Sequence, residues 1–217
     1  MSTKRIAILG SGAVGDALAA GFLISGYHVV RGTREPTKLA KWKESSGDKA
    51  TIASFAEAAA AVDTLVLAVK GTVAEDVIRG CGPASLSGKT IIDACNPISD
   101  AVPVKGVLSF FTKMNESLME RLQLIAPSAN FVKAFSCVGN GLMYKPSFAE
   151  KPTMFICGNN SAAKKTVSSI LGEFGWDVAD MGAVEAARAI EPLCILWCIP
   201  GFKDNSWFHA FRLLKQS

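Results

Sequence analysis

A glycine-rich segment near the start of the chain constrains the fold more than any other feature of the sequence. Residues 10–15 read GSGAVG and match the pattern G-x-G-x-x-G. An apolar run precedes them at 5–9, as expected for a buried strand, and apolar residues recur at helical spacing from 14 to 22. The glycine pattern alone is a weak signal, but a strand before it and a helix after it are typical of a βαβ unit that binds a dinucleotide.

Each glycine of the segment has a physical purpose in such a unit. Gly10 permits a tight turn, Gly12 lets the backbone approach a pyrophosphate, and Gly15 lets the helix pack closely on the strand. The free amides at the start of the helix then face the negative charge of the ligand. The alternative is a tight strand–helix turn that binds nothing.

The residues after the second strand, which we expect at 27–30, indicate which dinucleotide binds. A unit that binds NAD carries an acidic residue about 20 residues beyond the glycines, where it bonds the ribose. This chain has Thr33 and Arg34 instead, and Lys38 follows. The planar guanidinium of Arg34 suits a phosphate, and Thr33 offers a hydroxyl. The sequence therefore predicts NADP(H), and the alternative is a solvated surface cluster of Lys38 and its neighbouring lysines.

Strands and helices alternate along the rest of the chain, which predicts right-handed crossovers and a parallel sheet. We therefore expect an α/β fold of the Rossmann type, with a doubly wound, mostly parallel sheet that is extended by C-terminal strands and helices. Residues 1–135 would form the NADP-binding domain, and residues 136–217 an extension that packs on the same sheet and shapes the site of the second substrate. Further strands are expected at 50–53, 63–69, 89–95, 130–135, 153–158 and 176–181, and loops at 98–113 and 136–152.

The carboxyl ends of the central strands indicate where a ligand should lie, because ligands of doubly wound sheets bind beyond those ends. We expect the end of the strand at 63–69 near the adenosine and ribose, and the ends of the next two strands near the nicotinamide. Ordinary strand-end turns are the alternative. Cys137 is interpreted as a buried wall rather than a nucleophile, since no histidine is placed to activate it. The predicted residues are Ala68, Val69, Lys70, Cys95, Asn96, Pro97, Ser136, Cys137 and Val138.

Composition argues against several other classes of protein. The net charge is only +4 and the basic residues are scattered, so we expect no nucleic-acid partner. Six cysteines without a C-x-x-C pattern and two histidines predict no metal site, and reduced thiols suit a cytoplasmic protein. The longest apolar stretch near the end, 192–202, contains two prolines and falls short of the roughly 20 residues that a membrane span needs.

Groups for proton transfer are few. The Tyr-x-x-x-Lys pattern of short-chain dehydrogenases does not occur, His28 lies near the start of a strand, and His209 is expected at the surface of the terminal tail. Reduction of a carbonyl normally needs a general acid or base. Hydride exchange between a nicotinamide and a flavin-like ring needs less, because the cofactors carry the chemistry and the protein holds two rings face to face.

Several segments resemble NADPH-dependent deazaflavin (coenzyme F-420) reductases. They are also similar to the oxidoreductase domain of the six-transmembrane prostate metalloreductases. The resemblance rests on GSGAVGDALAAGFLISGYHVVRGTRE (10–35), VKAFSCVGNGLM (132–143), FICGNNSAAKKTV (155–167) and ADMGAVEAARAIEPL (179–193).

This resemblance implies NADP(H) as the cofactor and a deazaflavin (coenzyme F-420), FMN or FAD as the second substrate. The segment 136–139 reads SCVG, where the deazaflavin enzymes carry a histidine-containing segment and the metalloreductases an asparagine–threonine pair. That departure leaves the acceptor open. The resemblance implies a cofactor site of Gly10, Ser11, Gly12, Ala13, Val14, Thr33, Arg34 and Lys38, and a second ring near Ser136, Cys137, Val138 and Asn140.

The sequence thus predicts an NADPH-dependent oxidoreductase of the deazaflavin or flavin reductase type, with a small-molecule electron acceptor as its partner. Imine reduction, as in pyrroline-5-carboxylate reductases, is an alternative, although those enzymes append a longer helical dimerisation domain. An NADPH-binding redox sensor without turnover is an alternative from another class. The aromatic segment 195–211 predicts a homodimer interface, unless it covers the core of its own domain.

Overall fold

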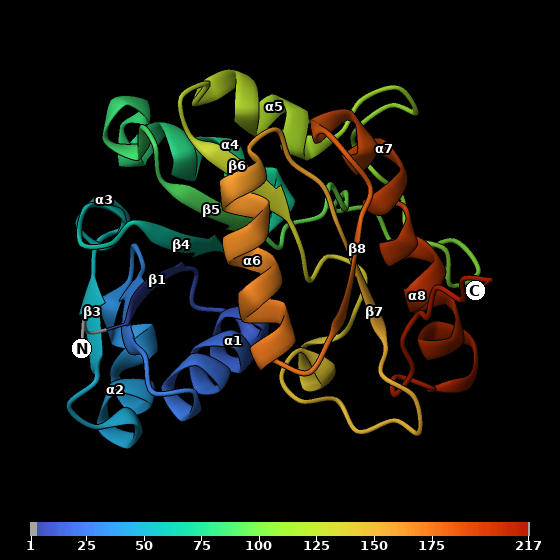
Figure 1. The fold of residues 1–217 in the computed structure, drawn as a ribbon, viewed down its shortest axis with the longest axis horizontal. Helices are drawn as coiled ribbons and strands as arrows, with labels where there is room; N and C mark the ends of the chain where they lie inside the picture. The colour runs from blue at the N-terminus through green and yellow to red at the C-terminus, as the bar shows by residue number, and fades with distance from the viewer. Residues whose placement is uncertain (1–3, 217) are drawn as a thin grey trace.

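The fold is centred on a six-stranded parallel sheet in a computed structural model that describes residues 4–216 (Figure 1). The strand order is β3-β2-β1-β4-β5-β6, so the chain starts in the middle of the sheet and builds outward in both directions. This order confirms the predicted doubly wound sheet of the Rossmann type. The strands are β1 (Arg5–Leu9), β2 (His28–Gly32), β3 (Ala50–Ala53), β4 (Thr64–Leu67), β5 (Thr90–Asp93) and β6 (Asn130–Lys133).

The central strands are buried on both faces, which explains their continuous apolar character. Side chains alternate along β1, so that Ile6 and Ile8 pack in one core layer and Ala7 and Leu9 in the other. Helices α1 and α6 cover the first face, where Figure 1 shows α6 crossing the sheet, and α3, α4 and α5 cover the second. The helices are α1 (Ala13–Ile24), α2 (Ala40–Ser46), α3 (Phe55–Ala60), α4 (Gly71–Cys81), α5 (Leu118–Ile125), α6 (Ser161–Glu173), α7 (Ala187–Ile190) and α8 (Leu193–Asp204).

The last third of the chain contributes two further strands, β7 (Thr153–Ile156) and β8 (Asp177–Asp180), which pair in a separate two-stranded parallel sheet. The prediction that they extend the main sheet is therefore wrong. A single antiparallel bridge joins the two sheets, in which the N–H of Lys133 donates to the carbonyl of Cys157 at 3.0 Å. The predicted domain boundary at residue 135 stays a prediction. Residues 1–3 and 217 of the two predicted domains lie outside the described residues.

The terminal tail folds back along β7 and covers the free side of that strand. The N–H of Thr153 donates to the carbonyl of Phe211 at 2.8 Å, and the N–H of Leu213 donates to the hydroxyl of Thr153 at 3.0 Å. Phe211 also packs against the first core layer. The aromatic segment 195–211 therefore covers the core of its own domain, while Phe202 and Phe208 remain exposed.

A buried charge network that the sequence did not reveal ties the extension to the main sheet. The Lys133 ammonium on β6 lies 2.6 Å from Asp93 Oδ2 on β5 and 2.8 Å from Glu191 Oε1, which follows α7. None of the three side chains exposes more than 1% of its surface. Glu191 also accepts the N–H groups of Leu118 and Met119 at the start of α5, at 3.0 and 3.1 Å, so the positive helix terminus balances its charge.

The same lysine supports the end of β5. Its ammonium donates to the carbonyl of Cys95 at 2.9 Å, directly before Asn96. Burial by itself would lower the pKa of Lys133, but the carboxylates of Asp93 and Glu191 outweigh burial and raise that pKa above its ordinary value. The lysine therefore stays charged, and a charged group held by three partners makes the strand end rigid.

Candidate dinucleotide site

The candidate site lies at the carboxyl edge of the sheet, where the chain leaves β1 and β4 in opposite directions. Gly10 has a φ of +141°, and a Cβ at that position would overlap the carbonyl oxygen of Ala68 at the end of β4. A Cβ on Gly71 would likewise overlap the carbonyl oxygen of Asn96 at the end of β5. The ends of three neighbouring strands thus touch one another, which brings together the predicted segments 10–15, 68–70 and 96–97.

The glycine loop leaves its backbone open at the start of α1. Nothing lies within 4 Å of the Cβ position of Gly12, which caps the start of α1, so the backbone is open to a ligand there. Ser11 and Gly12 line a cavity of about 410 Å³ together with Ala68 and Val69. The residues at the helix start take part differently, since Ala13 is exposed and Val14 packs against the core. Their predicted contacts would come from backbone amides rather than side chains.

Exposed cations flank the same cavity beyond β2. Arg34, Lys38 and Glu35 line it, and the side chain of Thr33 is buried at its wall. The Thr33 hydroxyl accepts the N–H of Glu35 at 3.1 Å, so it shapes the turn that presents Arg34. Lys38 Nζ lies 2.8 Å from Glu35 Oε1, and this hydrogen bond together with the lysine charge lowers the pKa of the Glu35 carboxyl.

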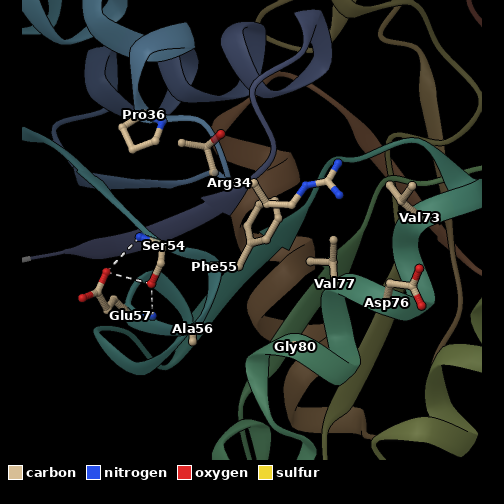
Figure 2. A pocket seen from close by; sticks show the side chains of 11 residues that line it. Arg34, Pro36, Ser54, Phe55, Ala56, Glu57, Val73, Asp76, Val77 and Gly80 are labelled. Carbon is tan, nitrogen blue, oxygen red and sulfur yellow. Dashed lines mark hydrogen bonds between the residues drawn. The ribbon is translucent and has the colours of Figure 1, made fainter.

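An apolar pocket of about 590 Å³ adjoins the cations (Figure 2). Phe55 from the start of α3 and Val73 and Val77 from α4 line it next to Arg34. Its floor is stable because Ser54 caps α3, where the hydroxyl and backbone of Ser54 and the side chain of Glu57 form a reciprocal capping box. The apolar walls of this pocket lie beside the exposed side chain of Arg34.

Arg31 is a residue of the site that the sequence analysis missed. β2 continues to Gly32, two residues beyond the predicted end, and places the Arg31 side chain under the glycine loop with 0% exposure. Its guanidinium donates from Nε and Nη2 to the carbonyl of Gly10 at 3.2 and 2.7 Å, and from Nη1 to Asp16 at 2.5 Å. A charged residue inside an apolar strand was the available signal, since such a charge needs partners nearby.

The ends of β5 and β6, where the sequence predicts the nicotinamide, meet in a buried part of the fold. The side-chain amide of Asn96 donates to the carbonyl of Ser136 at 2.7 Å, which joins the ends of β5 and β6. Asn96 Oδ1 and Ser136 Oγ are both buried and have no hydrogen-bond partner among the described residues. An amide oxygen accepts hydrogen bonds and a hydroxyl can donate or accept one, so both atoms keep unused hydrogen-bonding capacity.

The residues around this pair have different surroundings. Pro97 and Val138 are buried, and burial raises the pKa of the Cys137 thiol to about 12, which agrees with a wall rather than a nucleophile. Lys70 is exposed at the cavity, 3.8 Å from Asp100. Asn140 is exposed and lines a groove with Ala13 at the start of α1, apart from the buried Asn96–Ser136 pair.

The described residues offer few groups for acid–base or metal chemistry. No cluster of three potential metal ligands occurs in residues 4–216. In the same range, no helix has both the length and the hydropathy that a membrane crossing requires. His28 begins β2, at the opposite edge of the sheet from the crevice. His209, which the sequence places at the surface rather than in a catalytic role, is half-buried and stacks on Trp197 with ring centroids 4.9 Å apart.

Comparison with known proteins agrees with this geometry. Residues 5–97 match the model of a family described as NADP oxidoreductase, coenzyme F420-dependent. A solved protein from Arthrobacter sp. FB24, described as a candidate F420-dependent NADP-reductase, is 28% identical, with a TM-score of 0.89 over 97% of this chain and 99% of that one. Metalloreductase STEAP3 of Rattus norvegicus is 29% identical over 212 residues, which are 95% of this chain and 40% of the relative. The chain thus spans less than half of the metalloreductase.

More distant structures share the fold alone. Reductive aminase from Aspergillus terreus, solved with NADPH and ethyl levulinate, is 20% identical, with a TM-score of 0.68 over 94% of this chain and 63% of that one. SMa0349 from Sinorhizobium meliloti is 22% identical, with a TM-score of 0.73.

The resemblance predicted from the sequence is confirmed: over residues 5–97 this chain matches the F420-dependent NADP oxidoreductases.

Proposed function

We propose that this protein is an NADP(H)-dependent oxidoreductase that exchanges a hydride between NADPH and a deazaflavin or flavin acceptor. The observation that carries the proposal is the pairing of an exposed cationic edge, Arg34 and Lys38, with an open glycine loop at Gly12. The family match over residues 5–97 supports the nucleotide, and its name supports the deazaflavin.

In this proposal Arg34 binds the 2′-phosphate of the adenosine ribose through its guanidinium fork. Lys38 adds a second cation once the phosphate replaces Glu35 as its partner. Phe55, Val73 and Val77 pack against the adenine, and the amides of the glycine loop bind the pyrophosphate. The predicted residues Ser11, Ala13, Val14, Ala68, Val69 and Lys70 complete this half of the site.

At the other end, Asn96 and Ser136 would orient the nicotinamide by bonding its carboxamide. Reduced nicotinamide supplies the hydride when it is bound. Pro97, Cys137 and Val138 would form an apolar wall that excludes water, whereas Asn140 lines the separate groove beside α1. We further propose that residues 136–217 shape the acceptor side of the crevice. A flavin-type acceptor needs little from the protein beyond face-to-face placement of two rings, which suits a site where the described residues offer few acid–base groups.

The nucleotide assignment is tested with Arg34→Ala. Removing one charge-assisted contact to a phosphate costs about 1.5–3 kcal/mol, so NADPH should bind about 10- to 100-fold more weakly while NADH binding is unchanged. Lys41→Ala is the matched control, because it removes one exposed positive charge that does not line the cavity. An equal loss for both cofactors in calorimetric titrations would contradict the proposal.

The acceptor is tested by following nicotinamide absorbance in the presence of protein, NADPH and one acceptor at a time. The panel contains coenzyme F-420, FMN, FAD, a ferric chelate and a cyclic imine. Oxidation above the protein-free rate with a deazaflavin or flavin supports the proposal. Turnover with the imine alone would favour the imine reductase alternative, and tight NADPH binding without any turnover would favour the redox sensor.

We also propose that the protein forms a homodimer. Leu196, Phe202 and Phe208 are exposed on α8 and the tail that follows it. Exposed apolar groups of this size are found at protein interfaces. Light scattering across a range of concentrations tests this, and a constant monomer mass would contradict it.

A further inference from the structure

We infer that Arg31 is a positioning residue that turns the glycine loop toward the pyrophosphate of the cofactor. This inference rests on the proposed function, since it concerns how the same crevice holds its dinucleotide. Arg31 and Arg34 lie only three residues apart, yet one is fully buried and the other is exposed. A buried guanidinium without structural need would be costly, so the partners of Arg31 indicate its purpose.

The guanidinium of Arg31 binds the carbonyl oxygen of Gly10. Nε and Nη2 both donate to Gly10 O, at 3.2 and 2.7 Å, from beneath the loop. All peptide bonds of the described chain are trans, and in a trans peptide the C=O and N–H point in opposite directions. Holding the Gly10 carbonyl inward therefore turns the N–H of Ser11 outward, into the cavity that Ser11 and Gly12 line.

The rest of the guanidinium is anchored by elements on both sides. Nη1 donates to Asp16 in the first turn of α1 at 2.5 Å, and the guanidinium carbon lies 5.1 Å from the ring centroid of Trp42 on α2. Because α1, α2 and β2 all contribute, the donor fork has little freedom to turn away from Gly10. Its charge is paired with the carboxylate of Asp16, which is 56% exposed.

The third glycine of the motif belongs to this arrangement. A Cβ at Gly15 would lie 2.9 Å from both Arg31 Nη2 and the carbonyl oxygen of Gly10. Those are the two partners of the shortest bond to the loop carbonyl. In this chain Gly15 therefore makes room for the guanidinium as well as for the approach of helix and strand.

Three ligands separate a positioning role from general loosening of the fold. NADPH and NADH both contain the pyrophosphate, whereas adenosine 2′-phosphate lacks it but carries the phosphate expected at Arg34. In Arg31→Lys, which keeps the charge and loses the fork, we expect NADPH and NADH to bind about tenfold more weakly by the same factor. That factor corresponds to one hydrogen bond to a charged group. Binding of adenosine 2′-phosphate should be unchanged.

Arg34→Ala should give the complementary pattern, with weaker binding of NADPH and adenosine 2′-phosphate and unchanged NADH. If only this pattern failed, the NADP(H) assignment would be refuted. The Arg31 inference would still be supported by weaker NADH binding in Arg31→Lys. Arg5→Lys is the matched control, because it makes the same substitution at an exposed residue at the far end of β1, and all three ligands should bind it as they bind the wild type.

An equal loss of all three ligands in Arg31→Lys, or no loss of NADPH and NADH, would overturn the inference. Should the variant fail to fold, the wild-type protein still provides a test by amide NMR. Addition of NADH should shift the Ser11 N–H resonance among the most strongly affected amides. A bound NADH that leaves that resonance unmoved would also overturn the inference.

Discussion

In the proposed function, the two ends of the site bind the dinucleotide by opposite physical means. At the adenosine end, Arg34 and Lys38 stand exposed within six residues of β2, and water solvates them while the site is empty. At the proposed nicotinamide end, Asn96 Oδ1 and Ser136 Oγ are buried without hydrogen-bond partners among residues 4–216, and they come from segments 40 residues apart. An exposed charge costs the empty protein little, whereas a buried unpaired polar atom costs about 1–3 kcal/mol.

The difference indicates which end of the site supplies binding affinity and which end depends on a rigid support. The exposed end can contribute strongly to binding without any effect on folding. The buried end carries the cost of its unpaired atoms, and the network of Lys133, Asp93 and Glu191 supports the neighbouring end of β5 through the carbonyl of Cys95. Substitutions at the two ends should therefore separate effects on folding stability from effects on binding.

The largest expected effect is on stability, at the support of the buried end. Lys133→Met leaves the buried carboxylates of Asp93 and Glu191 without their cation, and breaking such a network costs about 3–5 kcal/mol of the free energy of unfolding. Lys151→Met, which removes an exposed lysine 3.6 Å from Asp177, should change it by less than about 0.5 kcal/mol. Urea unfolding measures both variants.

The free energy of unfolding that Lys133 contributes should depend on pH in a defined direction. Because the folded-state pKa of Lys133 is raised, its stabilising contribution is complete below the ordinary value of 10.5 and disappears only as the pH rises through the folded-state pKa. The difference between wild type and Lys133→Met should therefore be constant across neutral pH. A difference that vanished at neutral pH would show that the lysine is uncharged in the fold.

Two glycine substitutions test whether the loop backbone binds the pyrophosphate. Gly10→Ala forces a Cβ into the carbonyl of Ala68 at a φ of +141°, and should cost about 2 kcal/mol or more of stability. Gly12 has an ordinary φ of −94° and open space at its Cβ position, so Gly12→Ala should change stability by less than about 0.5 kcal/mol. The new methyl group would nevertheless keep a pyrophosphate from the backbone, with a loss of about tenfold in NADPH and NADH affinity. Unchanged affinity in Gly12→Ala would place the pyrophosphate elsewhere.

The smallest expected effect comes from the buried end itself. Ser136→Ala removes an unpaired buried hydroxyl, and should raise the free energy of unfolding of the ligand-free protein by about 1 kcal/mol. It should also weaken NADPH binding, since the hydroxyl is proposed to bond the carboxamide. Ser85→Ala is the opposite control, because that hydroxyl donates to the carbonyls of Cys81 and Gly82 at 2.6 and 2.8 Å and its loss should lower stability. Thermal unfolding with and without NADPH measures the stability and the NADPH binding of both variants. Tighter NADPH binding in Ser136→Ala would contradict the proposed role of this hydroxyl.

Local patterns made the exposed end predictable. Gly10, Gly12 and Gly15 lie between an apolar strand and an amphipathic helix, and Thr33, Arg34 and Lys38 follow in one short stretch. Each of these residues acts through its own backbone conformation or through charge at a fixed distance along the chain. The alternation of strands and helices likewise predicted the doubly wound sheet that the structure contains.

The buried end resisted prediction because it depends on partners that are distant in sequence. Asn96 and Ser136 were expected near the nicotinamide, but nothing in the sequence shows that Asn96 bonds the carbonyl of Ser136. The charge network joins β5, β6 and the residue after α7, and a lysine within an apolar strand does not name its carboxylates. The separate pairing of β7 and β8 was missed for the same reason, since strand propensity does not specify which sheet a strand joins.

The class of fold, the position of the glycine loop and the cationic stretch beside it follow from the sequence alone, because they depend on short-range periodicity, glycine geometry and charge. Only the tertiary structure decided that Arg31 lies beneath the loop while Arg34 faces solvent, three residues away. It also decided which carboxylates surround Lys133 and which polar atoms remain unpaired at the nicotinamide end. The physical reason is that burial and pairing are properties of packed surfaces, which form only when segments distant in sequence come into contact.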